Sequence, residues 1–399
     1  MSSSMAQWLE NQAAVRDRRG LVRRPLPREA DEQFIDLASN DYLGLATDPR
    51  LAEAAAAASS LWGTGATSSR LVAGTTRLHL DLEEELAGLS GMESALVFSS
   101  GYLANIGVIT ALGGPGTLIV ADEHCHASML DGFRLSRSRI QPFTHNSVED
   151  AGRQVADRPE PRALIAVESV FSVLGDEAPL AGLLALAEEH DAVLLIDEAH
   201  SLGVTGAGNF RGRGSVAGTP LAGHPNVIAT ATLSKALGSQ GGVVLGSALL
   251  REHLVNRARS FIFDTGLAPA SAAAALAAVQ IIRDEPWRAE AVQGNAAALA
   301  AGLAPVLAAR GAAVDRATVD RPTLDRAVGA VRSIAMPSAE SALAAAGTAR
   351  TAGVRIGCFR PPSVPDGISR LRLTARATLS PAEIEDSCAV LRGILEELP

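Results

Sequence analysis

The alternation of short apolar runs with longer amphipathic segments restricts the fold of this chain more than any other feature. Between residues 46 and 287, six runs rich in Val, Ile and Leu have the pattern of strands covered on both faces, as in a mostly parallel sheet. Segments with helical periodicity, such as 76–90 and 179–190, separate these runs and predict βαβ units. The six predicted strands are 93–100, 116–122, 162–169, 191–198, 226–233 and 241–247.

Changes in composition divide the chain into three predicted parts. Residues 1–45 are expected to form an N-terminal arm, with a helix over about 6–19 and then a connector rich in Pro and Arg. Residues 46–287 are expected to form a large α/β domain. Residues 288–399 are expected to form a smaller C-terminal α+β domain, which begins with Ala-rich helices. Its predicted segments are the Ala-rich stretch 289–310 and the runs 333–338, 353–359 and 369–376.

Composition and charge exclude several classes of protein. The net charge of −9 disfavours a nucleic-acid-binding protein, which usually has a basic domain. No apolar run resembles a membrane-spanning helix, and the N-terminus lacks the layout of a secretory signal. Three scattered cysteines fit a reducing compartment better than a disulfide framework. The expectation is therefore a cytoplasmic protein that binds neither membranes nor nucleic acid.

The basic residues are distributed unevenly. Residues 16–28 hold six arginines, which form either a solvated basic face or a clamp for an anionic substrate. Lys235 is the only lysine among 35 basic residues. A coding bias towards GC-rich codons explains why arginine replaces lysine elsewhere, but arginine cannot replace an amine that must react or lose its proton. Lys235 follows an apolar run and lies among small residues, so it is a candidate for Schiff-base chemistry.

A carboxylate ends another predicted strand. Asp197 follows a run of five apolar residues, which places it at the carboxyl end of a buried strand, where ligands bind in open α/β sheets. A buried carboxylate there requires a cation, unless it only caps the next turn. His200 lies three residues further on, in the loop that leaves the strand.

Two further segments carry polar groups at predicted strand ends. Ser100, Gly101 and Tyr102 lie between a strand and a helix, where backbone amides can bind a phosphate. The segment 122–126, Asp-Glu-His-Cys-His, resembles a metal site, but no second cluster completes a coordination shell, so no metal is expected. A dinucleotide fingerprint is also missing, because the nearest glycine-rich match follows a polar loop.

Together these motifs resemble pyridoxal-phosphate enzymes with the aspartate-aminotransferase fold (fold type I), and in particular the α-oxoamine synthases of their class-II group. The resemblance covers almost the whole chain. It implies an α/β fold with a mostly parallel central sheet and a smaller C-terminal α+β domain. The matching motifs are LASNDYLGL (37–45), FSSGYLAN (98–105), HASMLDG (126–132), VFSVLGDEAPL (170–180), IDEAHSLGV (196–204), TLSKALGSQGG (232–242), RPPSVPDG (360–367) and RLRLT (370–374).

The resemblance also implies roles for individual residues. Lys235 would hold pyridoxal 5'-phosphate covalently and later move the Cα proton of the substrate. Asp197 would pair with the pyridinium nitrogen, and His126 would stack on the ring and face the substrate. The other implied cofactor contacts are Gly101, Tyr102, Ser172, His200, Thr232 and, from a partner subunit, Thr265. The implied substrate contacts are Arg23, Ser363 and Arg372, the last through a bidentate pair with the amino-acid carboxylate.

Among the α-oxoamine synthases, the closer likeness is to those that join L-alanine to pimeloyl-CoA (or a pimeloyl carrier protein) in biotin biosynthesis, as homodimers. The alternatives within the family are the reactions of 2-amino-3-ketobutyrate CoA ligase, 5-aminolevulinate synthase and serine palmitoyltransferase. Two features depart from the sequence pattern of this family. Gly266 stands where relatives often have serine, and the N-terminal arm is only weakly similar. A regulator that binds the cofactor without turnover is disfavoured, because the arm is too short for a DNA-binding domain.

Overall fold

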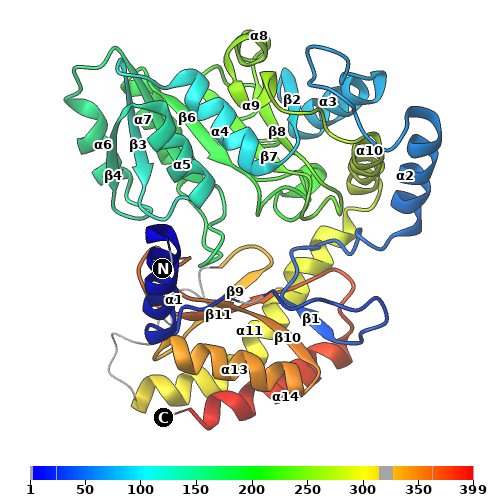
Figure 1. The fold of residues 1–399 in the computed structure, drawn as a ribbon, viewed down its shortest axis with the longest axis vertical. Helices are drawn as coiled ribbons and strands as arrows, with labels where there is room; N and C mark the ends of the chain where they lie inside the picture. The colour runs from blue at the N-terminus through cyan, green and yellow to red at the C-terminus, as the bar shows by residue number, and fades with distance from the viewer. Residues whose placement is uncertain (1–2, 24, 314–326, 362, 399) are drawn as a thin grey trace.

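A computed structural model of the chain describes residues 3–23, 25–313, 327–361 and 363–398. Figure 1 shows two bodies, each built on its own sheet, with the N-terminal helix beside the smaller one. The larger sheet has the strand order β2-β8-β7-β6-β5-β3-β4, and every neighbouring pair is parallel except the two that involve β8. Its strands are β2 (Ser94–Phe98), β3 (Thr117–Asp122), β4 (Arg139–Phe143), β5 (Arg162–Glu168), β6 (Val193–Asp197), β7 (Val227–Thr232) and β8 (Gly242–Gly246).

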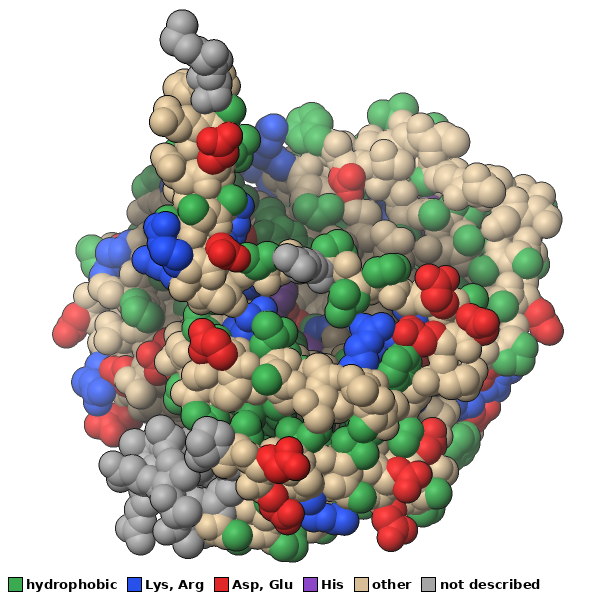
Figure 2. Space-filling view, turned by 60° about the horizontal axis from the view of Figure 1, so that its bottom comes forward, with side chains coloured by type: hydrophobic (Ala, Val, Ile, Leu, Met, Phe, Trp, Pro, Cys, Tyr) green, Lys and Arg blue, Asp and Glu red, His purple; other side chains and the backbone are tan. Residues whose placement is uncertain are grey.

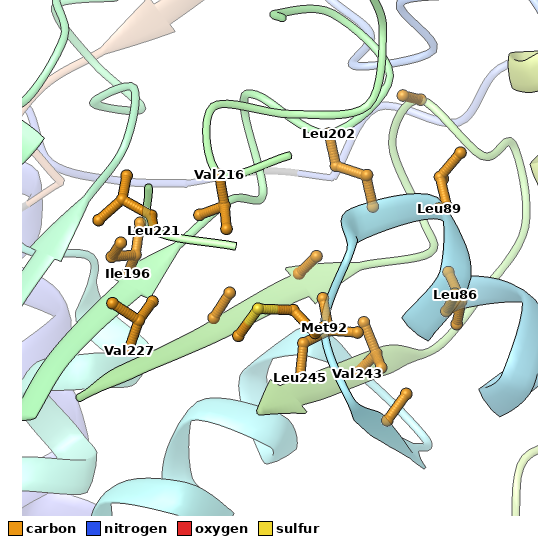
Figure 3. Close-up of a cluster of buried hydrophobic side chains, with 14 of the residues drawn as sticks. Leu86, Leu89, Met92, Ile196, Leu202, Val216, Leu221, Val227, Val243 and Leu245 are labelled. Carbon is orange, nitrogen blue, oxygen red and sulfur yellow. The ribbon is translucent and has the colours of Figure 1, made fainter. Parts of the chain in front are cut away.

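Helices cover both faces of the larger sheet. In β3, Leu118 and Val120 belong to the core on one face, whereas Ile119 and Ala121 belong to the core on the other. This double burial is why the strands appear in the sequence as continuous apolar runs. Figure 3 shows side chains of the first core, which includes residues of α2 (Pro49–Trp62), α3 (Arg77–Ser90), α6 (Val148–Ala156), α7 (Leu180–Glu189) and α10 (Pro269–Asp284). The second core includes residues of α4 (Gly101–Leu112), α5 (Ala127–Ser136), α8 (Ala248–Arg257) and α9 (Arg259–Ile262).

The smaller sheet has the strand order β1-β10-β11-β9. In β11, Leu371 and Leu373 enter a core that lies under the helices, so the alternating residues Arg370 and Arg372 lie on the opposite face. The strands are β1 (Ile35–Leu37), β9 (Val331–Ala335), β10 (Val354–Phe359) and β11 (Arg370–Thr374). The covering helices are α11 (Trp287–Ala313), α13 (Ala339–Thr351) and α14 (Pro381–Glu396).

The segment predicted as an arm joins three parts of the molecule. Helix α1 (Ser4–Arg18) has no buried residue. Further on, β1 pairs in parallel with β10, so this part of the arm supplies a strand to the smaller sheet. The chain then enters the core of the larger body, where Tyr42 and Leu45 are fully buried. The backbone carbonyl of Tyr42 accepts a hydrogen bond from the amide of Ala377 (2.7 Å), which follows β11 of the smaller sheet and packs into the same core as Tyr42.

Part of α11, Trp287–Ala309, is long and apolar enough to cross a membrane. Its residues Leu299 and Leu303 are fully buried in the core of the smaller body, as expected for the core helix of a globular protein. The three cysteines are free, as predicted.

Candidate active site

Two cavities share the side chains of Lys235, His126 and His200. The smaller, of about 250 Å³, lies between the first residues of α4 and the carboxyl ends of β5, β6 and β7. The larger, of about 570 Å³, extends towards the smaller body. Figure 2 shows a hollow in the molecular surface, with histidine side chains (purple) visible inside it. The carboxyl ends of parallel strands are where ligands bind in open α/β sheets.

The cavities bring together all but one of the predicted site residues. The smaller cavity is lined by Gly101, Tyr102, His126, Asp197, His200, Thr232 and Lys235. The larger is lined by Arg23, His126, Ser172, His200, Lys235, Ser363 and Arg372. Thr265 lines neither cavity and forms an isolated β-bridge with Ser69.

Lys235 is the first member of a hydrogen-bonded chain. Its Nζ lies 2.7 Å from Nε2 of His200, and Nδ1 of His200 lies 2.6 Å from the hydroxyl of Tyr42. Burial, and after it the charge of Lys235, lowers the pKa of His200 well below its ordinary value. Burial also lowers the pKa of Lys235, to about 8. The amine is therefore poised to gain or lose a proton near neutral pH.

Asp197 forms the floor of the smaller cavity. Its Oδ2 accepts a hydrogen bond from Nδ2 of Asn105 (2.7 Å), and its Oδ1 accepts from the amide of Ala199 (2.9 Å). Asn105 also donates to Oγ of Ser128 (2.9 Å) and accepts from Oγ1 of Thr230 (2.7 Å). The carboxylate is thus held in one orientation, and no cationic side chain donates to it among the described residues.

Ser128 links this floor to one wall of the cavity. Its amide donates to Nδ1 of His126 (3.3 Å), and its hydroxyl lies 2.8 Å from the same nitrogen. Since Nδ1 accepts, the ring proton of a neutral His126 lies on Nε2. Burial lowers the pKa of His126, which favours this neutral form.

Glu168 and Asn105 are site residues that sequence reasoning missed. Glu168 ends β5 in register with Asp197 of β6, and both line the smaller cavity. Burial, followed by the charge of Asp197, raises the pKa of Glu168 to about 8. The signal was available, because the apolar run 162–169 contains a carboxylate near its end just as 191–198 does. Asn105 is the lone amide in an otherwise apolar stretch of α4.

The predicted anion site lies at the N-terminus of α4, at one end of the smaller cavity. Ser100 caps α4, its hydroxyl accepting from the amide of Leu103 (3.2 Å), and Gly101 begins the helix. A Cβ at Gly101 would lie 2.9 Å from Cβ of Thr232, so a side chain there would fill the space between the helix and β7. Ser100, Gly101 and Thr232 line this end of the cavity, and the backbone amides of a helix N-terminus are groups that bind phosphate.

These residues fit pyridoxal phosphate. The smaller cavity has an amine on one side, a buried carboxylate on its floor and a helix N-terminus at one end. Oε1 of Glu168 is buried there without a hydrogen-bond partner. A flat pyridinium ring with a phosphate would supply both a cationic hydrogen-bond donor for Asp197 and the anion that the helix terminus favours.

Arg372 crosses from the smaller body towards the larger cavity. Its Nε donates to the carbonyl of Ser172 (2.7 Å), and its Nη1 donates to Oδ1 of Asn40 (3.0 Å). Nη2 is buried without a partner. The free donors for a carboxylate therefore lie on Nη2, and a bidentate pair that also used Nε would require the Ser172 bond to open.

The arm closes the larger cavity from one side. Nη2 of Arg23 donates to Oγ of Ser363 across 2.8 Å, and both residues line the cavity. The two predicted substrate contacts therefore meet, although they lie 340 positions apart in the sequence.

A cluster around His145 supports the loops that carry His126 and Ser172. Nδ1 of His145 lies 2.9 Å from Asp122 at the end of β3, and Nε2 lies 2.9 Å from Asp176. His124 stacks on this ring with centroids 4.0 Å apart. The described residues contain no group of three or more His, Cys, Asp or Glu side chains suited to a metal ion.

This ion-pair cluster predicts a pH-dependent stability. Burial alone would lower the pKa of His145, but the hydrogen bonds and charges of Asp122 and Asp176 raise it from 6.5 to about 9. The stabilisation, about 3 kcal/mol, is fully present below pH 6.5 and is lost as pH rises through 9. Urea unfolding at about pH 6 and about pH 10 should show that His145→Gln destabilises the chain far more at the lower pH. The exposed His253→Gln is the control, and an equal effect of His145→Gln at both pH values would contradict the assignment.

Comparison with known proteins identifies the class. The family model of class I and II aminotransferases matches residues 32–391. The 8-amino-7-oxononanoate synthase of Mycolicibacterium gilvum (strain PYR-GCK) is 48% identical over 393 residues, which cover 98% of this chain and 96% of that protein. A solved structure of SPT with its PLP internal aldimine matches at 28% identity with a TM-score of 0.87, covering 98% of each chain.

The structure of 8-amino-7-oxononanoate synthase from Francisella tularensis shares the fold, with a TM-score of 0.75 at 24% identity over 91% of this chain and 98% of that one. The chain therefore belongs to the class I and II aminotransferase family, and the predicted fold-type I architecture is confirmed. It is an enzyme of that family. Within the family it belongs with the 8-amino-7-oxononanoate synthases.

Proposed function

We propose that this enzyme joins L-alanine to the pimeloyl group of pimeloyl-CoA, or of a pimeloyl carrier protein, to give 8-amino-7-oxononanoate for biotin synthesis. The reaction releases CO2 and the thiol that carried the acyl group, which is CoA or the carrier protein. The names of relatives at 48% identity support this reaction. The observation that carries the chemistry is Lys235, whose amine faces the cavity with its pKa lowered to about 8 by burial. Its cofactor would be pyridoxal 5'-phosphate, which supplies an electron sink for the charge that develops at Cα of the amino acid.

Lys235 would first bind the cofactor and then, as a free amine, take the Cα proton of alanine. His200 and Tyr42 hold this amine in position through the chain of contacts described above. Burial raises the pKa of Tyr42 to about 12, so its hydroxyl remains a neutral hydrogen-bonding group during turnover. Arginine cannot move this proton, because its guanidinium stays charged.

The other residues would bind and orient. Asp197 would stabilise a protonated ring nitrogen, with Asn105 fixing the direction of the carboxylate. His126 would cover one face of the ring and border the space for the substrate. The unpaired Nη2 donors of Arg372 would bind the carboxylate of alanine.

We further propose that the enzyme is a cytoplasmic homodimer whose active sites lie at the interface. Thr265 lies outside both cavities of its own chain, which agrees with a contact made to the site of a partner subunit. Exposed apolar side chains such as Val72 and Phe263 are available for such an interface.

A matrix of substrates tests the proposed reaction. The holoenzyme is supplied with glycine, L-alanine or L-serine, each with pimeloyl-CoA, succinyl-CoA, acetyl-CoA or palmitoyl-CoA, and CoA release is followed. We expect the highest kcat/KM with L-alanine and pimeloyl-CoA. No turnover of that pair, together with turnover of another, would overturn the proposal and assign a different reaction of the same class.

A further inference from the structure

We infer that a groove between the N-terminal arm and the smaller body binds the acyl chain of the donor, and that Arg360 recognises the carboxylate at the far end of that chain. This inference rests on the proposed function and names the residue that would select a dicarboxylic acyl group. The groove has a volume of about 670 Å³. Residues from both walls line it: Asp17, Gly20, Leu21, Val22, Arg23, Leu26, Leu343, Cys358, Arg360, Pro361 and Ser363.

The groove adjoins the cavity that contains Lys235. Arg23 and Ser363 line both spaces and are hydrogen-bonded to each other across 2.8 Å. Arg360 lines the groove but not the cavity. A molecule whose thioester lies near Lys235 could therefore extend past Arg23 into the groove.

The lining fits a chain that is apolar in its middle and anionic at its end. Leu21, Val22, Leu26, Leu343 and Pro361 provide aliphatic walls for methylene groups. Arg23 and Arg360 provide the positive charge among the lining residues, and Asp17 is the carboxylate among them. The carboxylate of Glu340, close to Gly20, also interacts with Arg360, so a bound carboxylate would share this arginine with it. A pimeloyl group has this pattern, since its polymethylene chain joins the thioester to a free carboxylate.

The guanidinium of Arg360 is fixed by a hydrogen bond that leaves other donors free to bind a carboxylate. Its Nη1 donates to the carbonyl of Gly20 (2.7 Å), which ties the loop after β10 to the arm. That bond uses one of five guanidinium protons, so donors remain for a carboxylate. Arg23 also makes one hydrogen bond, to Ser363, but it lines both spaces and so would contact the chain nearer to Lys235.

The test compares pimeloyl-CoA with heptanoyl-CoA, which has the same chain length but no distal carboxylate. With the holoenzyme and L-alanine, we expect the wild type to prefer pimeloyl-CoA. In Arg360→Leu, the ratio of kcat/KM for the two donors should fall roughly 10- to 100-fold, because one charge-assisted pair is lost. Arg360→Lys should retain part of the preference, since the positive charge remains.

Arg18→Leu is the matched control, because Arg18 is an exposed arginine of the arm that lines neither space. Thermal unfolding of each variant shows whether it is folded. An equal loss for both donors in Arg360→Leu would overturn the inference and place Arg360 against the CoA part instead. An equal preference of the wild type for both donors would also overturn it, whereas failure of both donors with L-alanine would overturn the proposed function.

Discussion

Lys235→Arg is expected to lower kcat by at least about 10⁴-fold, because proton transfer by a positioned base and covalent attachment of the cofactor are lost together. The substitution preserves the positive charge opposite Asp197 and Glu168, so the loss would reflect chemistry and not charge balance. The chain has no other lysine that could take over. Single-turnover assays with L-alanine and pimeloyl-CoA measure the effect.

Two further measurements isolate the role of the amine. Borohydride reduction of the wild type should attach pyridoxal phosphate to the peptide that contains Lys235, and Lys235→Arg should give no such peptide. Lys235→Ala should recover part of its activity when a small alkylamine is added. A Lys235→Arg enzyme with more than about one-hundredth of wild-type kcat would contradict the assignment of the base.

Asp197→Asn is expected to lower kcat about 10²- to 10³-fold, because a neutral amide cannot stabilise a buried cation in the way a carboxylate does. The amide has nearly the same shape, and the amide of Ala199 can still donate to its oxygen. The variant should therefore fold, yet bind pyridoxal phosphate more weakly. Titration of the apoenzyme with the cofactor, followed by fluorescence, measures the affinity.

The exposed Asp386→Asn on α14 is the control for the Asp197 substitution. It removes one negative charge from the chain without touching either cavity, so its kcat and cofactor affinity should equal those of the wild type. If Asp197→Asn bound the cofactor as tightly as the wild type and kept its kcat, Asp197 would be a capping residue of the turn after β6.

The apolar strands of the larger sheet were predictable because burial on both faces leaves an unbroken run of Val, Ile and Leu. Predicted and observed bounds differ by at most two residues, as for 191–198 against Val193–Asp197. Strand β4 was missed because it lies at the edge of the sheet, contains Pro142 and buries only Phe143. Strand β1 is only three residues long and takes its partner from β10, more than 300 positions away.

Site residues were predictable from the sequence where they lie within a recognisable local motif. Lys235, Asp197 and His126 border one cavity, although their roles remain predictions. What sequence could not supply was the orientation of groups between the two bodies. Nε of Arg372 donates a hydrogen bond to the carbonyl of Ser172, which lies 200 positions away in the sequence. This bond leaves Nη2 as the free donor of Arg372. Pairing across such distances depends on packing and not on local pattern.

The segment around Tyr42 gives the molecule a mechanical property. Strand β1 belongs to the smaller sheet, the backbone of Tyr42 is bonded to Ala377 just after β11 of that sheet, and its hydroxyl contacts His200 in the larger body. A hinge rotation between the bodies would therefore pull on the same side chain that positions His200 beside Lys235. The relative orientation of the two bodies and the position of the Lys235 amine are therefore coupled. Closure of the bodies around a substrate would move Tyr42, and through His200 it would move the nitrogen that reacts.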